Sequence, residues 1–169
     1  VEAGIKNVRS DFGWYMFQNK PEEWKASRFT NLLAKARAAG VAVLPIATGG
    51  CNFASPTLGR PDQYRLFGGF VGRMVSDFKD DFPVVEIWNE ENVGGFWPPA
   101  PNAAHYVGAL RQAYRAAKQA SPTIRIAFGG TAGPDTGFYH QAYGQGAKDC
   151  FDIVNIHPYC MPNAPEGWL

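Results

Sequence analysis

Apolar and polar positions divide the chain into two alternating kinds of segment. Short runs rich in apolar and β-branched residues, typical of buried strands, lie at 5–11, 41–47, 84–89, 124–129 and 151–157. Between them, residues repeat with helical periodicity at 24–39, 63–80, 103–120 and 136–144. Gly40 and Pro122 follow two of these segments and mark helix ends. The chain therefore alternates strand and helix from end to end.

Strands that alternate with helices predict an α/β fold with a parallel sheet. A doubly wound open sheet and a (β/α)8 barrel both fit this order. A nucleotide-binding open sheet usually has a glycine-rich loop after its first strand, whereas here Phe12, Gly13 and Trp14 follow. A closed barrel needs about 250 residues, and this chain has 169. We therefore expect residues 1–169 to form a single incomplete TIM-type (β/α)8 barrel domain with about five parallel strands in sequence order.

Composition narrows the classes of function. Lys and Arg number 16 against 15 Asp and Glu, so the net charge of +1 gives no reason to expect nucleic acid or an anionic membrane as a partner. Hydrophobic residues make up 46% and charged residues 18%, which excludes a disordered chain. No apolar run approaches the roughly 18 residues that a membrane span needs.

The cysteines and the start of the chain carry little chemistry. Cys51, Cys150 and Cys160 have no metal-binding spacing, and we expect mostly free thiols and neither metal nor cofactor. Cys150 and Cys160 flank one predicted strand and lie too far apart to pair. The chain begins without an initiator Met or a signal peptide, so we expect it to be a piece of a longer protein.

Polar side chains gather at the carboxyl ends of the predicted strands, where parallel β/α proteins hold their chemistry. Arg9 and Asp11 share one face of the first strand, and Asn155, His157 and Tyr159 share one face of the last. Each of these residues also has a purely structural interpretation. Arg9 and Asp11 could form a structural ion pair, and His157 could be a hydrogen-bonded core histidine. Trp88 and Trp97 are equally consistent with core aromatics.

Glu90 is the leading candidate for catalysis. It ends the third predicted strand beside Asn89 and aromatic residues, surroundings that raise a carboxyl pKa and suit a general acid. The alternative to a catalytic role is that Glu90 is an ordinary glutamate in a surface loop. Glu91 points to the opposite face of an extended chain, so a second catalytic carboxylate must come from elsewhere.

Four segments resemble the clan A glycoside hydrolases, nearest the branch of β-xylosidases and α-L-iduronidases. The most specific is Glu86-Ile87-Trp88-Asn89-Glu90-Glu91-Asn92, followed by Phe96-Trp97-Pro98, which resembles the fourth-strand motif of that clan. Segments 4–14, 40–46 and 151–159 look like its second, third and sixth strands in the same order. The resemblance spans nearly the whole chain and implies a fragment that covers the second to sixth β/α units.

The resemblance implies a retaining hydrolysis of a β-linked glycan or glycoside, such as a xyloside, without a cofactor. Glu90 would be the general acid/base, and Asn89 would hydrogen-bond the sugar 2-hydroxyl. Arg9, with Asp11 beside it, would orient the nucleophilic carboxylate at the substrate site. His157 and Tyr159 would line the sugar subsite. Trp14 and Trp97 would offer ring faces to the sugar.

Two departures from the family pattern stand out. The proline that follows the catalytic glutamate is Glu91 here, which adds a negative charge beside Glu90 and could raise its pKa. The clan's nucleophile belongs to a seventh strand, which this chain does not reach, and we do not expect the later Glu166 to replace it.

Two other functions stay open: a non-catalytic carbohydrate-binding or oligomer-forming module, and an open α/β domain that uses Arg9, Asp11 and His157 for unrelated chemistry. The Glu90→Gln variant separates enzyme from binder, and strand order separates barrel from open sheet. An incomplete barrel exposes two strand edges, so we expect homo-oligomers. The resemblance also implies a secreted or periplasmic protein with a carbohydrate substrate.

Overall fold

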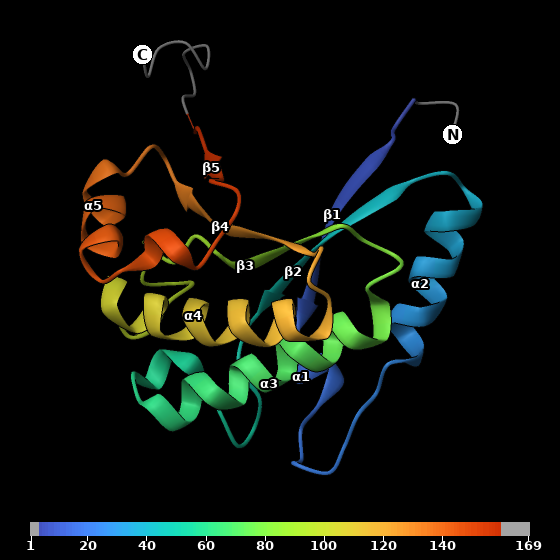
Figure 1. The fold of residues 1–169 in the computed structure, drawn as a ribbon, viewed down its shortest axis with the longest axis horizontal. Helices are drawn as coiled ribbons and strands as arrows, with labels where there is room; N and C mark the ends of the chain where they lie inside the picture. Colours follow the sequence, from blue (N-terminus) through green and yellow to red (C-terminus); the bar gives the residue numbers. More distant parts are fainter. Residues whose placement is uncertain (1–3, 160–169) are drawn as a thin grey trace.

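A computed structural model describes residues 4–159 and contains five strands and five α-helices in that range (Figure 1). The strands are β1 (Asn7–Gly13), β2 (Ala42–Thr48), β3 (Val84–Asn89), β4 (Arg125–Ala132) and β5 (Ile156–His157). The α-helices are α1 (Trp14–Phe17), α2 (Ser27–Ala38), α3 (Pro61–Phe78), α4 (Ala103–Ala120) and α5 (Thr136–Gly144). Two short 3-10 turns, η1 (Pro56–Leu58) and η2 (Ala147–Asp149), complete the list.

The sheet has the order β1-β2-β3-β4-β5, and every neighbouring pair is parallel. Strand order therefore follows chain order, as in part of a barrel, and never reverses within the sheet. This confirms the predicted α/β fold with five parallel strands. It also excludes the doubly wound open sheet, whose order switches direction partway across the sheet.

The helices cover one face of this sheet, and the core lies between the two layers (Figure 1). Helices α3 and α4 pack side by side, with Gly68 and Gly72 of α3 against α4. A Cβ at Gly68 would lie 2.9 Å from the backbone of Gln112. The two helices therefore lie so close together here that only glycine fits without a shift of the backbone. Toward β1, the core is aromatic: Phe17 stacks on Phe29, and Trp14 stacks on Phe70.

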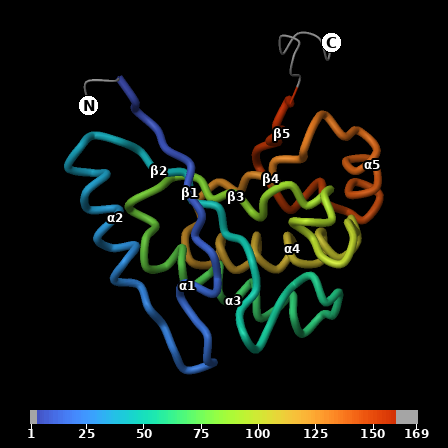
Figure 2. Tube along the Cα trace, turned by 180° about the vertical axis from the view of Figure 1, so that it is seen from behind, coloured from blue at the N-terminus to red at the C-terminus, as the bar shows by residue number. Residues whose placement is uncertain are grey.

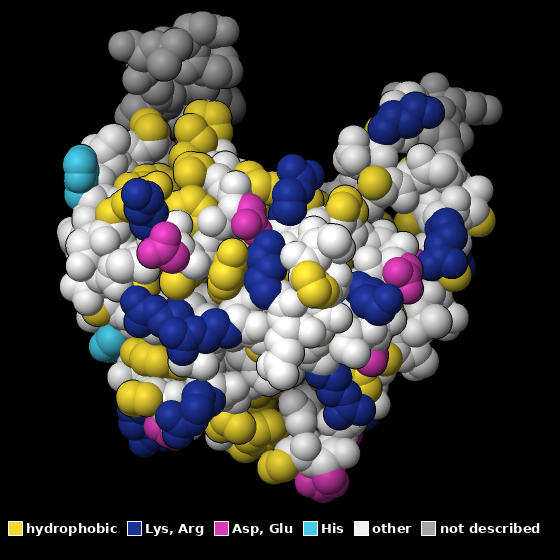
Figure 3. All heavy atoms as spheres, viewed as in Figure 1, with side chains coloured by type: hydrophobic (Ala, Val, Ile, Leu, Met, Phe, Trp, Pro, Cys, Tyr) yellow, Lys and Arg dark blue, Asp and Glu magenta, His cyan; other side chains and the backbone are white. Residues whose placement is uncertain are grey.

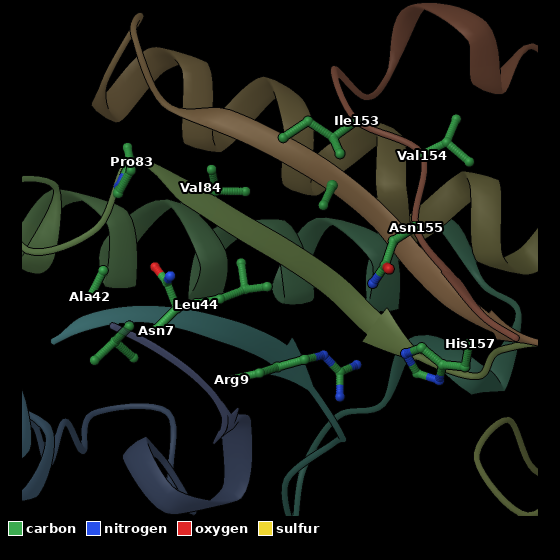
Figure 4. Close-up of a pocket in the computed structure, with 12 residues that line it drawn as sticks. Asn7, Arg9, Ala42, Leu44, Pro83, Val84, Ile153, Val154, Asn155 and His157 are labelled. Atoms are coloured by element: carbon green, nitrogen blue, oxygen red, sulfur yellow. The ribbon is translucent and has the colours of Figure 1, made fainter. Parts of the chain in front are cut away.

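No other element among residues 4–159 covers the opposite face of the sheet, which forms a hollow of about 440 Å³ (Figures 3 and 4). Leu44, Val84 and Ile153 line its wall, and Arg9, Asn155 and His157 stand near the carboxyl end of the strands. Within residues 4–159, β1 pairs only with β2 and β5 only with β4, so both ends of the sheet are edges (Figure 2). The sheet is thus curved but not closed.

Two differences from the sequence-based expectation have physical reasons. The predicted strand at 151–157 is reduced to Ile156–His157 plus one bridge between Ala127 and Ile153, because it is an edge that only β4 supports in the described range. Helix α2 begins at Ser27 and not at residue 24, because Trp24 packs against Phe17 while Arg73 covers its ring. Across residues 4–159, no helix is both long and apolar enough to cross a bilayer.

Candidate active site

The end of β3 turns sharply, and this turn builds the site. Trp88 and Glu90 have φ values of 76° and 50°, in the left-handed region that residues with side chains rarely adopt. Two hydrogen bonds hold the turn: Trp88 Nε1 donates to the Phe96 carbonyl at 3.0 Å, and Glu90 N donates to the Gly130 carbonyl at 3.0 Å. The regular alternation of an extended strand is broken here. As a result, both Asn89 and Glu90 meet polar partners from other strands, whereas Glu91 is buried on the helix side.

Glu86 anchors the polar side of the site. It is fully buried and accepts from Arg9 Nε at 2.7 Å and from Arg9 Nη2 at 2.8 Å. It also accepts from Asn155 Nδ2 at 2.9 Å and from the Gly130 amide at 3.1 Å. One carboxylate thus ties together strands β1 and β4 and the residue before β5. These charge-assisted bonds offset the cost of burying the charge.

Arg9 therefore pairs with Glu86, and the alternative of a structural ion pair with Asp11 is wrong. Arg9 Nη2 also donates to Asn89 Oδ1 at 2.8 Å, which orients the Asn89 side chain. Asp11 is exposed and forms no ion pair or hydrogen bond with its side chain inside residues 4–159. The role of Glu86 was not predicted, although an acidic residue inside the apolar run Val84-Val85-Glu86-Ile87 was a usable signal.

Glu90 is brought together with His157 and Tyr159, as the sequence predicts. Its Oε1 atom lies 2.8 Å from His157 Nδ1 and accepts a short hydrogen bond from the Tyr159 hydroxyl, while Tyr159 and His157 also contact each other at 3.2 Å. The Oε2 atom makes no hydrogen bond within the described residues. Glu90 is 7% exposed, and Oε1 is held in place by two side chains while Oε2 has no partner in the described part of the chain.

The expectation that the surroundings of Glu90 raise its pKa is wrong. Burial does raise the pKa, but the hydrogen bonds from Tyr159 and His157 and the charges of His157 and Arg9 outweigh it. The pKa of Glu90 is therefore lowered, and the side chain is a stable carboxylate in this structure. The direction of the pKa shift of Glu90 is set by hydrogen-bond donors whose positions in space the sequence does not reveal.

Glu91 differs from its neighbour in every respect. It is 0% exposed, and burial raises its pKa to about 8. Its own backbone amide opposes this rise, and the charges of Glu86 and Glu90 add to it. Glu91 is thus largely neutral at pH 7. The expected second negative charge beside Glu90 is therefore largely absent at this pH. The prediction that Glu90 and Glu91 point to opposite sides is confirmed.

Trp14 and Trp97 lie in the core, and each is 1% exposed. Trp14 stacks on Phe70, and Trp97 packs edge-on against Trp88 and Tyr106. Neither indole presents a face to the hollow, so the prediction that they stack on a sugar is wrong for this structure. The aromatic residue that does stand at the site is Tyr159, which is exposed.

Outer contacts hold the site in place. The Tyr139 hydroxyl donates to the Asn155 carbonyl at 2.5 Å, which fixes the chain just before β5. Asn92 Oδ1 accepts from Ala132 N at 2.9 Å, and its Nδ2 donates to Asp135 Oδ2 at 3.0 Å. The loops after β3 and β4 are thereby tied to each other, which keeps Glu90 at a fixed distance from the next strand.

Residues 4–159 contain no group of three or more His, Cys, Asp or Glu that could hold a metal ion. Cys51 and Cys150 are free thiols, and Cys160 lies outside the described residues. Glu166, considered and set aside as the nucleophile, also lies outside them.

Solved structures of glycoside hydrolases share this fold. A family 39 glycoside hydrolase from the gut symbiont Bacteroides cellulosilyticus WH2 has a TM-score of 0.77 and 22% identity, over 96% of this chain and 34% of that one. A fungal β-1,4-galactanase has a TM-score of 0.69 and 18% identity, over 93% and 53% of the two chains. The GH53 catalytic domain from Ignisphaera aggregans has a TM-score of 0.65 and 23% identity, over 94% and 50%.

These similarities show the fold alone: the five-stranded parallel α/β sheet of this chain is like part of the barrel in these glycoside hydrolases. The chain spans about a third to a half of the length of these three relatives. No protein-family model and no curated protein sequence matches it. Activity therefore has to be argued from the site.

Proposed function

We propose that the chain carries the acid/base half of a retaining glycoside hydrolase site, with Glu90 as the general acid/base. The observation that carries the proposal is the Glu90 carboxylate, whose Oε1 is held by His157 and Tyr159 while Oε2 makes no bond within the described residues. The similarity of the fold to glycoside hydrolases supports it. By resemblance of the motif, a β-xyloside or a related β-glycoside is the proposed substrate.

Each neighbouring side chain has a separate role in this proposal. Asn89 Oδ1 accepts from Arg9, so the Asn89 amide NH₂ is directed outward and can donate to a sugar hydroxyl. Arg9 and Glu86 form the rigid base under Asn89. His157 and Tyr159 hold Oε1. Oε2 first donates a proton to the glycosidic oxygen as the bond breaks, and later takes a proton from the attacking water.

The lowered pKa of Glu90 constrains the mechanism. A general acid must be protonated when the glycosidic bond breaks, and the donors around Oε1 oppose that. A second carboxylate placed about 5 to 5.5 Å away as nucleophile would raise the pKa of Glu90 by charge repulsion. We propose that this nucleophile comes from outside residues 4–159, on another segment or another chain.

Sugar binding without turnover is the second candidate, and the lowered pKa of Glu90 favours it. An ionised carboxylate with one available oxygen accepts hydrogen bonds from sugar hydroxyls well but is a poor proton donor. In that case Glu90 and Asn89 would form a recognition pair on the open hollow, and hydrolysis would be absent.

The test is hydrolysis of a panel of aryl β-glycosides, including the β-xyloside and the β-galactoside, by wild type and by Glu90→Gln. We expect the substitution to reduce turnover by about 10²- to 10⁴-fold, the usual contribution of a general acid/base. Glu22→Gln removes an exposed carboxylate and serves as the matched control. Turnover that survives in Glu90→Gln contradicts the catalytic role. Glycoside binding by NMR without turnover indicates the second candidate, and neither binding nor turnover contradicts both.

A further inference from the structure

Glu91 is a buried acid with no visible partner. Both of its carboxyl oxygens are inaccessible, and neither makes a hydrogen bond in the described part of the chain. It directly follows Glu90, so any movement of the Glu91 side chain is transmitted through one peptide unit to the candidate acid/base. A buried charge without partners is costly, and the position therefore needs an explanation.

The surroundings of Glu91 suit a neutral acid and not a carboxylate. The point that a Cβ on Gly129 would occupy lies 2.1 Å from Glu91 Oε2 and 2.8 Å from the Ile87 carbonyl oxygen, so these two oxygens are at most about 5 Å apart. Both are acceptors when Glu91 is ionised. The Tyr106 hydroxyl cannot donate to Glu91 while it donates to the Ile87 carbonyl at 3.0 Å, and its oxygen accepts from Gly129 N at 2.8 Å.

The titratable groups that affect Glu91 add no positive charge. Glu86 and Glu90 belong to its own strand and turn, Tyr106 comes from α4, and Tyr139 comes from α5. The two carboxyl groups raise the pKa of Glu91 further after burial has raised it. The backbone amide of Glu91 itself favours the ionised form, but burial outweighs it. Apart from this amide, ionisation would place a charge among acceptors, carboxyl groups and two phenols.

We propose that Glu91 is a positioning residue that packs beneath the end of β3 only as a neutral carboxylic acid, and that loss of its proton releases the turn that carries Glu90. The turn is suited to such a change because Trp88 and Glu90 already have unfavourable φ values, which the surrounding contacts must maintain. The inference rests on the proposed function only in assigning Glu90 its role. It predicts a site that is assembled at neutral pH and disordered in mildly alkaline solution.

Carboxyl ¹³C NMR of the full chain tests the proposal without substrate. The sequence has seven glutamates, and the Glu91 signal can be assigned by its sequential connection to Asn92. We expect this signal to titrate near pH 8, far above the usual value of 4.5. We also expect the indole N–H signal of Trp88, which donates to Phe96, to shift with the same midpoint.

Glu91→Gln is the variant that separates positioning from simple packing. The amide has nearly the same shape and cannot ionise, so the Trp88 signal should no longer change between pH 7 and 9. Wild-type stability to urea should fall as pH rises from about 5 to about 8, because the unfolded Glu91 ionises first and folding must take up a proton in that range. This decline should be smaller in Glu91→Gln than in wild type or in Glu22→Gln.

Three results would overturn the proposal: a Glu91 signal that titrates near its usual pH, a titration near pH 8 that leaves the Trp88 signal unchanged, or a Trp88 shift that persists in Glu91→Gln. If Glu91→Gln does not fold, the wild-type titration still shows whether either of the first two results occurs, and so still tests the proposal. A failed hydrolysis assay affects the proposed function only, because none of these measurements involves a glycoside.

Discussion

One oxygen of Glu90 receives both donors of the site, and this sets the charge state of the group. The Tyr159 hydroxyl and His157 Nδ1 converge on Oε1, which stabilises the carboxylate form. The same contacts fix the side chain in one orientation. Preorganisation and acidity are therefore coupled at this residue, and one cannot be changed without the other.

Tyr159→Phe removes one donor and keeps the ring. We expect the pKa of Glu90 to rise toward its usual value, because the hydrogen bond from the Tyr159 hydroxyl is one of the contacts that lower it. Carboxyl NMR reads the shift directly, and in an active preparation the alkaline limb of the pH profile should move to higher pH, because the general acid must be protonated. Tyr143→Phe removes an exposed hydroxyl elsewhere and should leave Glu90 unchanged. An unaltered or lower Glu90 pKa in Tyr159→Phe contradicts the role assigned to the hydroxyl.

At the scale of elements, the contact between α3 and α4 depends on bare glycines. Gly68 faces α4, whereas the adjacent Gly69 is exposed and a Cβ there would meet nothing within 4 Å. The pair therefore offers the same substitution in two surroundings, one residue apart on one helix.

Gly68→Ala should destabilise the chain by about 1–3 kcal/mol, because the added methyl meets the Gln112 backbone and pushes the helices apart. Gly69→Ala should stabilise it by about 0.5–1 kcal/mol, since alanine favours an exposed helix interior. Urea unfolding of the two variants checks both values. If the two substitutions change the free energy of unfolding equally, the close packing of α3 on α4 does not contribute measurably to stability.

Element boundaries were predictable where local chemistry defines them. Helices α4 and α5 match the predicted 103–120 and 136–144, and in both the side chain before the first residue caps the helix: Asn102 accepts from His105 N and Asp135 accepts from Phe138 N. Helix α2 has no side-chain cap at Ala26, and its start was misplaced. Glu90, Asn89, Arg9 and His157 were found from their places at strand ends, because parallel strands gather those ends.

Other features of the site arise from packing over long sequence separations. The left-handed φ of Trp88 is invisible in a strand of apolar residues, yet it decides which side chains face the hollow. Glu86 gains its role through Arg9, which is 77 residues away, and through Gly130 and Asn155. Trp14 and Trp97 were predicted to stack on sugar rings, and their contacts with neighbouring aromatic rings show that they belong to the core.

For the molecule as a whole, the two sheet edges and the uncovered face are the dominant feature. Val8 on β1 is 40% exposed, and Val154 just before β5 is 53% exposed. Unpaired parallel edges beside exposed apolar residues favour pairing with another chain. We therefore expect the chain to self-associate when it is alone in solution.

Light scattering should give a mass above the 18.5 kDa of one chain. Lysine at both Val8 and Val154 should shift the mass toward that of the monomer, because charged residues on an edge oppose strand pairing. Leu58→Lys changes an equally exposed apolar residue on η1, away from both edges, and should not. A monomeric wild type at the concentrations used for NMR would rule out association through the edges.

Strand order also bears on how the chain reaches its native state. Each strand after β1 pairs with the one before it in the chain, so from β2 onward no strand has to wait for a later one before its first neighbour exists. Folding can therefore proceed in the direction of synthesis, with each β/α unit added to a template that is already in place. A ribosome-bound chain of this kind grows its sheet from the β1 end, and its newest strand always has one edge without a partner until the next strand is added.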